Sequence, residues 1–171
     1  GASSAGALVL VNPPHQPFVP ALAAQGLDAS RLLVLQGPTL ARDAAARVWA
    51  CEQALRCAGV SAVLAWLPQV RPEQLRRLQM AAQNFQQALF VMRPLPAQQE
   101  ASPAVLRLLL ESGEGVDADA LTVRLLKRRG PPLTTPLVLP ARPERLQALL
   151  AASRQQSARR RQGQGVALPV V

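Results

Sequence analysis

The chain has 171 residues, of which 49% are hydrophobic and only 3% aromatic, and its formal net charge is +9. This length can bury one sizeable core, and because no run of 18 apolar residues occurs, we predict no membrane-spanning helix. The charge comes from eighteen arginines and one lysine, which favours polyanionic partners. The scarcity of aromatic rings excludes a surface on which bases stack, so we expect at most sequence-indifferent contact with a nucleic-acid backbone.

Short apolar runs alternate with helical patterns through the first half of the chain. We predict strands at 7–11, 31–36, 61–67 and 88–93, and helices at 19–25, 39–57 and 72–86. Thr39 is expected to cap the second of these helices. Near-continuous apolar strands separated by helices are typical of a parallel sheet that is covered on both faces.

The pattern changes after Pro94. A loop at 94–104 leads to two strands, 105–112 and 121–129, which flank an acidic turn that contains glycine; this arrangement indicates an antiparallel hairpin. The proline-flanked segment 136–140 fits only an edge strand. Further along we predict a helix at 143–153, with leucines at helical spacing, and a basic, mobile tail at 154–171.

Few side chains in the sequence suit metal or covalent chemistry. Cys51 and Cys57 lie six residues apart in one helical pattern and therefore face different sides, and His15 is the only histidine. We therefore expect no zinc site. The cysteines fit neither a disulfide framework nor an activated nucleophile, which makes a reducing cytoplasm the expected location. His15 has no nearby Ser, Cys or carboxylate, so we interpret it as a loop residue rather than a general base.

Four stretches carry a resemblance to one family: LVLVNPPHQPFVPALAAQGLD, AVLAWLPQVRPEQLRRLQMAAQ, ALFVMRPL and SPAVLRLLLE…LTVRLLKRRGPP. They lie within residues 7–132 and resemble ImuA, the RecA-like and SulA-related family of bacterial mutagenic translesion synthesis. The resemblance implies an α/β fold, a three-layer RecA-like core with a mostly parallel sheet and an antiparallel C-terminal extension. It implies a RecA-like domain at 1–153 that lacks the nucleotide-loop segment, so we expect a segment to be missing upstream.

The positions that carry catalysis in RecA-type ATPases hold other side chains here. By the resemblance, Pro14 stands where a water-activating glutamate follows the first strand, and Trp66 stands where a magnesium-side aspartate ends a later one. The phosphate-sensing amide corresponds to the region of Met92 and Arg93, and no GxxxxGK[ST] loop occurs. Phosphoryl transfer needs a phosphate cradle, a metal carboxylate and a water-positioning group together. We therefore expect a protein that is not an enzyme and uses no cofactor.

The resemblance implies a non-catalytic adaptor in the SOS mutagenesis complex. Such an adaptor binds ImuB, a catalytically inactive Y-family polymerase-like protein, and links it to the error-prone polymerase DnaE2. Contact with RecA, contact with DNA and a homo-oligomer are left open. The alternative is a SulA-like cell-division inhibitor that binds FtsZ, since SulA-like proteins lack the same catalytic groups. The basic extension at 154–171 favours the DNA-repair interpretation.

Four basic residues crowd the end of the strand predicted at 121–129. Strand alternation would place Arg124 and Arg128 on one face. Lys127 and Arg129 would then lie on the other. This cluster is a candidate contact for DNA or an acidic partner, and the alternative is a charged edge that discourages aggregation.

Further candidates lie in the tail and at the tryptophans. Arg159, Arg160 and Arg161 precede the apolar segment VALPVV, which has the composition of a strand that adds to a partner. Trp66 could anchor a partner or pack in the core. Trp49 is expected to pack in the core.

Overall fold

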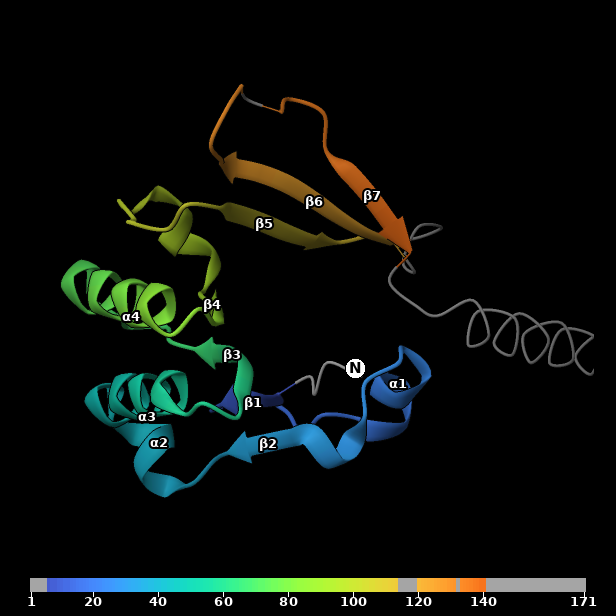
Figure 1. Cartoon of the computed structure of the whole chain (residues 1–171). Coiled ribbons are helices and arrows are strands. Elements are labelled where there is room, and N and C mark those ends of the chain that lie inside the picture. Colours follow the sequence, from blue (N-terminus) through green and yellow to red (C-terminus); the bar gives the residue numbers. More distant parts are fainter. Residues whose placement is uncertain (1–5, 114–119, 132, 141–171) are drawn as a thin grey trace, which may run out of the picture. The chain divides into compact units, whose positions relative to one another are not determined.

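The computed structural model describes residues 6–113, 120–131 and 133–140. The chain divides into two compact units, Gly1–Leu109 with Arg124–Pro136, and Leu110–Val123 with Leu137–Val171. The described strands form two separate sheets (Figure 1), one parallel and one antiparallel. No helix in the described ranges is long and apolar enough to cross a membrane.

The parallel sheet has four strands in the order β2-β1-β3-β4. These are β1 (Ala7–Val11), β2 (Leu32–Leu35), β3 (Val60–Trp66) and β4 (Ala88–Met92). The chain steps one way from β1 to β2 and the opposite way from β2 across to β3 and β4. Because crossover connections are right-handed, the first crossover helix and the later ones lie on opposite faces of the sheet. The prediction of a parallel α/β core with helical layers is therefore confirmed.

One face of this sheet is buried beneath α3 (Ala44–Arg56) and α4 (Pro72–Asn84). Alternate strand residues point to that face, including Val11 of β1 and Val63 of β3, and both are fully buried. They pack in one cluster with Leu55 of α3 and Leu78 of α4. Burying one such leucine contributes about 1.5–3 kcal/mol to stability, so this cluster is the main source of the fold's stability.

The opposite face is equally apolar but only partly covered by the described residues. The register aligns Leu64 with Leu10 on one side and with Phe90 on the other. Leu10 is buried, Leu64 is half-buried, and Phe90 is 52% exposed. The first crossover helix, α1 (Val19–Ala24), has no buried residue. Helices therefore flank both faces, as predicted, but the face beneath α3 and α4 is covered more fully than the opposite one.

The helix predicted at 39–57 is divided in two, α2 (Pro38–Arg42) and α3. The break lies at Asp43, whose backbone is extended and whose side chain accepts a hydrogen bond from the backbone N–H of Ala45 at 2.7 Å. Asp43 is thus the N-cap of α3, because an extended residue with a side-chain acceptor satisfies an orphan helix donor. The prediction that Thr39 caps this helix is wrong, since Thr39 lies within α2.

A buried arginine holds the α2–α3 corner together. Arg47 is 4% exposed, and its Nη1 donates to the carbonyls of Leu40 at 2.7 Å and Ala41 at 3.1 Å. These carbonyls belong to the last turn of α2, which has no intrahelical donors left for them. The guanidinium of Arg47 therefore caps the C-terminal end of α2.

The second sheet has the order β5-β6-β7. It is preceded by the 3₁₀ helix η2 (Leu95–Gln99) and contains β5 (Arg107–Ser112), β6 (Ala120–Lys127) and β7 (Leu137–Pro140). The N–H of Gly113 donates to the carbonyl of Ala120 at 2.9 Å, and β7 pairs antiparallel with β6. The predicted hairpin and edge strand are confirmed. The turn at 114–119, the helix at 143–153 and the tail at 154–171 lie outside the described residues.

Candidate partner-binding surface

The carboxyl ends of the parallel strands are where open α/β sheets hold their ligands. After β1, Asn12 has φ 51° and donates its N–H to the carbonyl of Leu35 at 2.8 Å. Pro13 is buried, whereas Pro14 and His15 are exposed. The Nε2 of Gln36 donates to the carbonyl of Pro13 at 2.9 Å. This corner is thus held by backbone and amide groups, and Pro14 brings no carboxylate to it.

The ends of β3 and β4 carry apolar and cationic groups. Trp66 is half-buried as the last residue of β3, and it is paired with Met92, the last residue of β4. The following Arg93 forms an ion pair with Glu100 at 2.9 Å, so this carboxylate is already engaged. Within the described ranges, no three His, Cys, Asp or Glu side chains gather as a metal site would require.

The two cysteines face different sides, as their spacing predicts, but the expectation that both are buried helix residues is wrong for Cys57. Cys51 is buried in the core, and burial, helped by the charge of Glu52, raises the pKa of its thiol to about 12. This thiol stays protonated at neutral pH and is no nucleophile. Cys57 is exposed at the end of α3, and its Sγ contacts the carbonyl oxygen of Gln53 at 3.3 Å.

The basic cluster after β6 is arranged differently from the prediction. β6 ends at Lys127, two residues before the predicted end of the strand, so strand alternation no longer fixes the faces of Arg128 and Arg129. The Nζ of Lys127 donates to the carbonyl of Ser102 at 2.9 Å, which gives this residue a structural contact. Arg128 and Arg129 are exposed in the turn that follows the strand.

The other predicted contact residues lie on other elements or outside the described residues. Arg124 is exposed on β6, next to buried Val123, but Trp66 belongs to the parallel sheet. Arg159, Arg160 and Arg161 lie outside the described residues. Among the described residues, Trp66 and the basic cluster after β6 therefore belong to different sheets.

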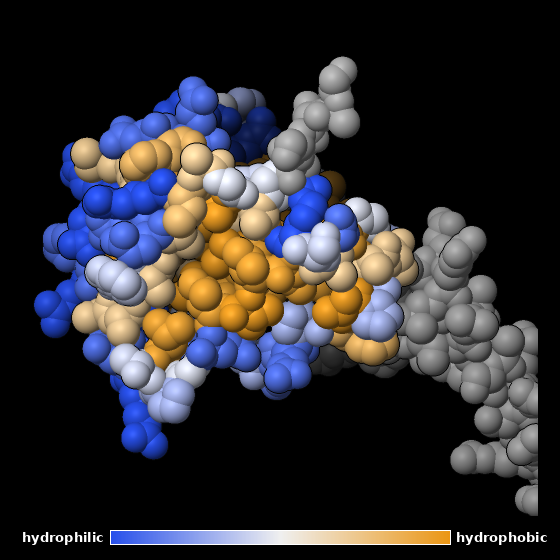
Figure 2. Space-filling view, turned by 60° about the horizontal axis from the view of Figure 1, so that its bottom comes forward, coloured by the Kyte–Doolittle hydropathy of each residue, from blue (hydrophilic) through white to orange (hydrophobic). Residues whose placement is uncertain are grey.

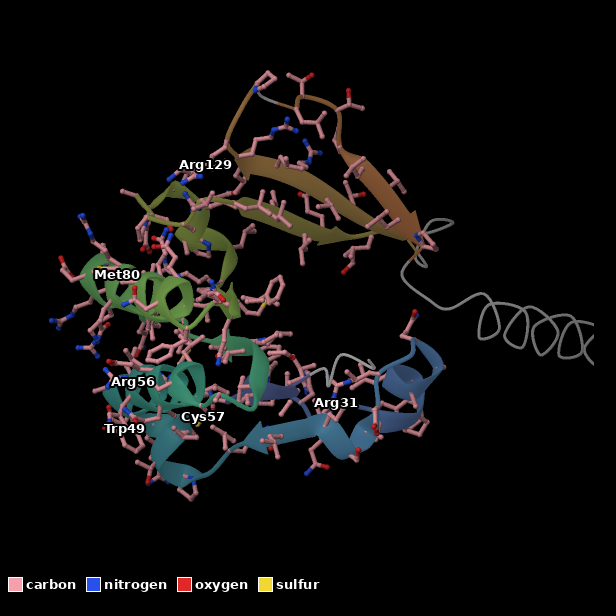
Figure 3. All side chains as sticks on the ribbon, viewed as in Figure 1. Arg31, Trp49, Arg56, Cys57, Met80 and Arg129 are labelled. Atoms are coloured by element: carbon pink, nitrogen blue, oxygen red, sulfur yellow. The ribbon has the colours of Figure 1, made fainter. Side chains whose placement is uncertain are left out.

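Trp49 is the clearest departure from the predicted core. Its side chain is 62% exposed and projects from the outer side of α3 (Figure 3). The buried residues of α3 include Val48, Cys51 and Leu55, and Trp49 lies one position off this stripe, which is about 100° around the helix. The same spacing that predicts the helix would have placed Trp49 outside the core.

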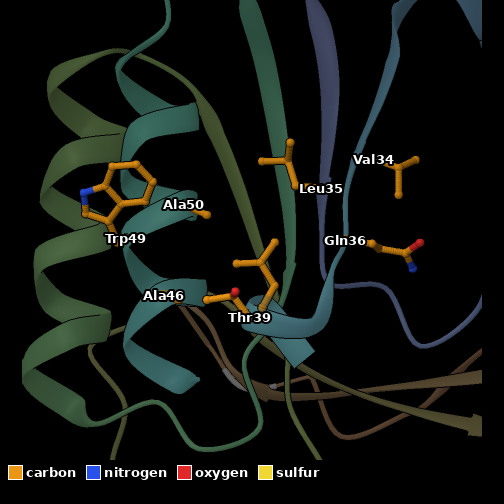
Figure 4. A pocket seen from close by; sticks show the side chains of 8 residues that line it. Val34, Leu35, Gln36, Thr39, Ala46, Trp49 and Ala50 are labelled. Atoms are coloured by element: carbon orange, nitrogen blue, oxygen red, sulfur yellow. The ribbon is translucent and has the colours of Figure 1, made fainter. Parts of the chain in front are cut away.

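Trp49 borders an open apolar hollow of about 460 Å³ between α3 and the end of β2 (Figure 4). Three elements contribute to it: β2 with the residue after it, α2, and α3. The lining residues are Val34, Leu35, Gln36, Thr39, Leu40, Ala46, Trp49 and Ala50. Most of these side chains are hydrocarbon, so the hollow suits an apolar side chain rather than an ion.

The strand beside this hollow is an unprotected sheet edge. β2 is the outer strand of the sheet, and Leu33, Val34 and Leu35 are all exposed, Leu33 by 49%. Edges are usually guarded by charge or proline. Here the nearest charged residue, Arg31, donates its guanidinium to the carbonyl of Gly6 (Figure 3). The edge is left apolar.

We call Leu33, Val34, Leu35 and Trp49 the β2 edge surface. Figure 2, in which the β2 side of the molecule is turned forward, shows apolar residues gathered in a continuous patch. A contiguous apolar patch of this kind marks a protein contact more often than a solvated surface. Sequence reasoning found the strand but missed the surface, because periodicity does not reveal which strand lies at the edge.

A second hollow, of about 730 Å³, opens near the amino ends of β1 and β3. Its lining is more polar and includes Arg56, Ser61 and Gln87. The Nε2 of Gln87 donates to the carbonyl of Cys57 at 2.8 Å, while its Oε1 is buried without a partner. This end of a parallel sheet is opposite to the one at which α/β folds bind ligands.

No family model matches the chain, and no curated protein matches it. Among solved structures, the crystal structure of SulA from Pseudomonas aeruginosa is similar, with 26% sequence identity and a TM-score of 0.42. The matched region covers 53% of this chain and 73% of SulA.

Proposed function

We propose that this protein is a non-catalytic adaptor of the bacterial SOS mutagenesis complex. In this role it binds an ImuB-type polymerase-like protein in the cytoplasm and links it to a DnaE2-type polymerase. The proposal begins with the sequence resemblance to the ImuA family over residues 7–132.

The observation that supports a binding role is the composition of the carboxyl edge of the parallel sheet. Pro14 is exposed and Trp66 half-buried at the two positions where the resemblance would expect carboxylates. The carboxylate of Glu100 is paired with Arg93. In the described part of the chain, this edge offers apolar surface and no group of acids that could hold a metal, which suits a protein contact better than phosphoryl transfer.

The experiment is co-purification in two parallel arms. The chain is mixed with an ImuB-type protein in one arm and with FtsZ in the other, and each mixture is separated by size-exclusion chromatography. We expect co-elution with the polymerase-like protein alone. Co-elution with FtsZ alone would replace the proposal by the cell-division alternative, and binding to neither would overturn both.

Nucleotide binding provides a separate check. Isothermal titration with ATP and magnesium is expected to give no dissociation constant in the micromolar range or tighter, because a phosphate cradle and a metal carboxylate are both needed. Tight binding would contradict a purely adaptor role.

Direct DNA contact is tested separately, and Arg128 and Arg129 suit this test because both are exposed. If each contacts a phosphate, R128A and R129A together should reduce the slope of log affinity against log salt by about 2. An unchanged slope would assign both charges to solubility.

A further inference from the structure

We propose that the β2 edge surface receives an extended strand, and that this strand is Val166–Val171 of a second copy of the chain. This self-association is independent of the proposed function, since it requires no polymerase and no nucleic acid. It concerns the outer edge of β2, one of the two edge strands of the parallel sheet among the described residues.

The first argument is the state of the edge itself. β2 pairs with β1 along Leu32–Leu35, and it is one of the two terminal strands of the sheet. Among the described strands none pairs with its outer backbone groups, and another strand could do so, with main-chain hydrogen bonds that would supply affinity. Arg31 and Gln36, the polar residues on either side, both donate to backbone carbonyls of their own chain. Neither guards the edge.

The second argument is the hollow that lies against the same strand. An added strand sends alternate side chains to the two faces of the sheet, so one of them would meet the opening between β2 and α3. That opening measures about 460 Å³, which is within the range of small-ligand pockets. Trp49 is among the residues that line it, and a largely exposed tryptophan beside an apolar hollow is typical of an interaction hot spot.

The third argument identifies the occupant. The sequence continues for 31 residues beyond Pro140, and its last six, VALPVV, carry no charged side chain. β-Branched valines suit a strand, and Pro169 restricts that strand to an edge. Leu168 is the largest side chain in the segment and the one that we assign to the hollow. The stretch RQGQG before it contains no hydrophobic side chain and two glycines, the composition of a tether.

A segment that we predict to be flexible separates the predicted helix from the apolar segment. Residues 154–165 can span roughly 40 Å when extended, at about 3.3 Å per residue. If each copy places its C-terminal strand on the β2 edge of the other, both β2 edges are occupied, and the dimer is closed by two-fold symmetry. The second contact then forms at the high effective concentration that the first provides.

The test measures the mass of the chain across a concentration series by sedimentation velocity. We expect a monomer–dimer equilibrium in the wild type. L168D in the tail and L33K on the edge should each weaken dimerisation at least tenfold. The matched controls are L168I, which preserves the apolar segment, and F18K, which places a lysine at another exposed apolar residue; both should dimerise normally. Circular dichroism and thermal unfolding verify that L33K is folded.

A mixing experiment distinguishes exchange from any other dimer. L33K retains its tail and L168D retains its edge, so the mixture should regain a heterodimer with one strand contact while neither variant dimerises alone. A wild type that is monomeric at all concentrations would overturn the proposal. So would a dimer that both variants leave intact. If the wild type is monomeric and L168D alone increases hydrogen exchange at β2, the segment occupies its own chain and the second copy is excluded.

Discussion

The parallel sheet has two apolar surfaces, of which one is buried and the other is exposed to solvent. Beneath α3 and α4, alternate strand residues are fully buried, while at β2 the same kinds of side chain, leucine and valine, lie exposed. Hydropathy is equal in the two places, so composition does not explain the difference. What differs is topology, because interior strands have neighbours on both sides and an edge strand does not. Apolar residues therefore stabilise the fold in one place and offer a contact in the other.

The largest effect should come from applying one substitution to both surfaces. L78A removes a fully buried side chain from the core and should lower the free energy of unfolding by about 2–5 kcal/mol. L33A makes the same change at an exposed edge residue and should cost under about 0.5 kcal/mol. Urea unfolding followed by circular dichroism measures both. Equal losses would mean that the edge is part of the core.

Arg47 provides a second test, at the α2–α3 corner between the buried core and the exposed β2 edge. R47A would leave the carbonyls of Leu40 and Ala41 without their buried donor, which should cost about 1–3 kcal/mol. R42A, in the same corner but exposed, is the matched control and should be nearly neutral. A similar loss in both variants would show that general charge, not capping, stabilises the corner.

A smaller change in stability tests whether the helix predicted at 39–57 is divided into α2 and α3. D43A removes the side-chain acceptor for the N–H of Ala45 and should lower the free energy of unfolding by about 1 kcal/mol. T39A should change it much less, because Thr39 does not cap α3. The reverse result in thermal unfolding would restore the single helix that the sequence pattern predicts.

The smallest effect on stability concerns the two thiols. At pH 8, a thiol reagent should modify Cys57 quickly in the folded protein and Cys51 only after unfolding, since burial raises the pKa of Cys51 to about 12. The raised pKa means that the contribution of Cys51 to stability is complete below its ordinary value of 9.0 and is lost as the pH rises toward 12. C57S should unfold like the wild type. Two fast thiols would show that the core opens readily.

Most of the architecture follows from local patterns. The strands around Val9, Leu64 and Phe90 are short apolar runs between helical repeats, and such runs predict a parallel sheet. The hairpin follows from alternation around Val123. These features depend on residues close together in the chain, which is why sequence reasoning finds them.

The remaining features depend on residues that are distant in the sequence or on a choice between similar caps. Thr39 and Asp43 are both good N-caps, and the pattern alone does not decide between them. The β2 edge surface needs the strand order, which no local pattern supplies. For the catalytic positions, the assignment of Pro14 and Trp66 came from the family resemblance rather than from spacing.

The positions of the two tryptophans allow intrinsic fluorescence to report on the hollow. The chain has no tyrosine, so its near-ultraviolet fluorescence comes from Trp49 and Trp66. The exposed indole at the hollow should emit at long wavelength and be quenched by iodide, whereas the half-buried one at the end of β3 should emit further to the blue and resist quenching. Occupation of the hollow would then be visible as a blue shift in unlabelled protein.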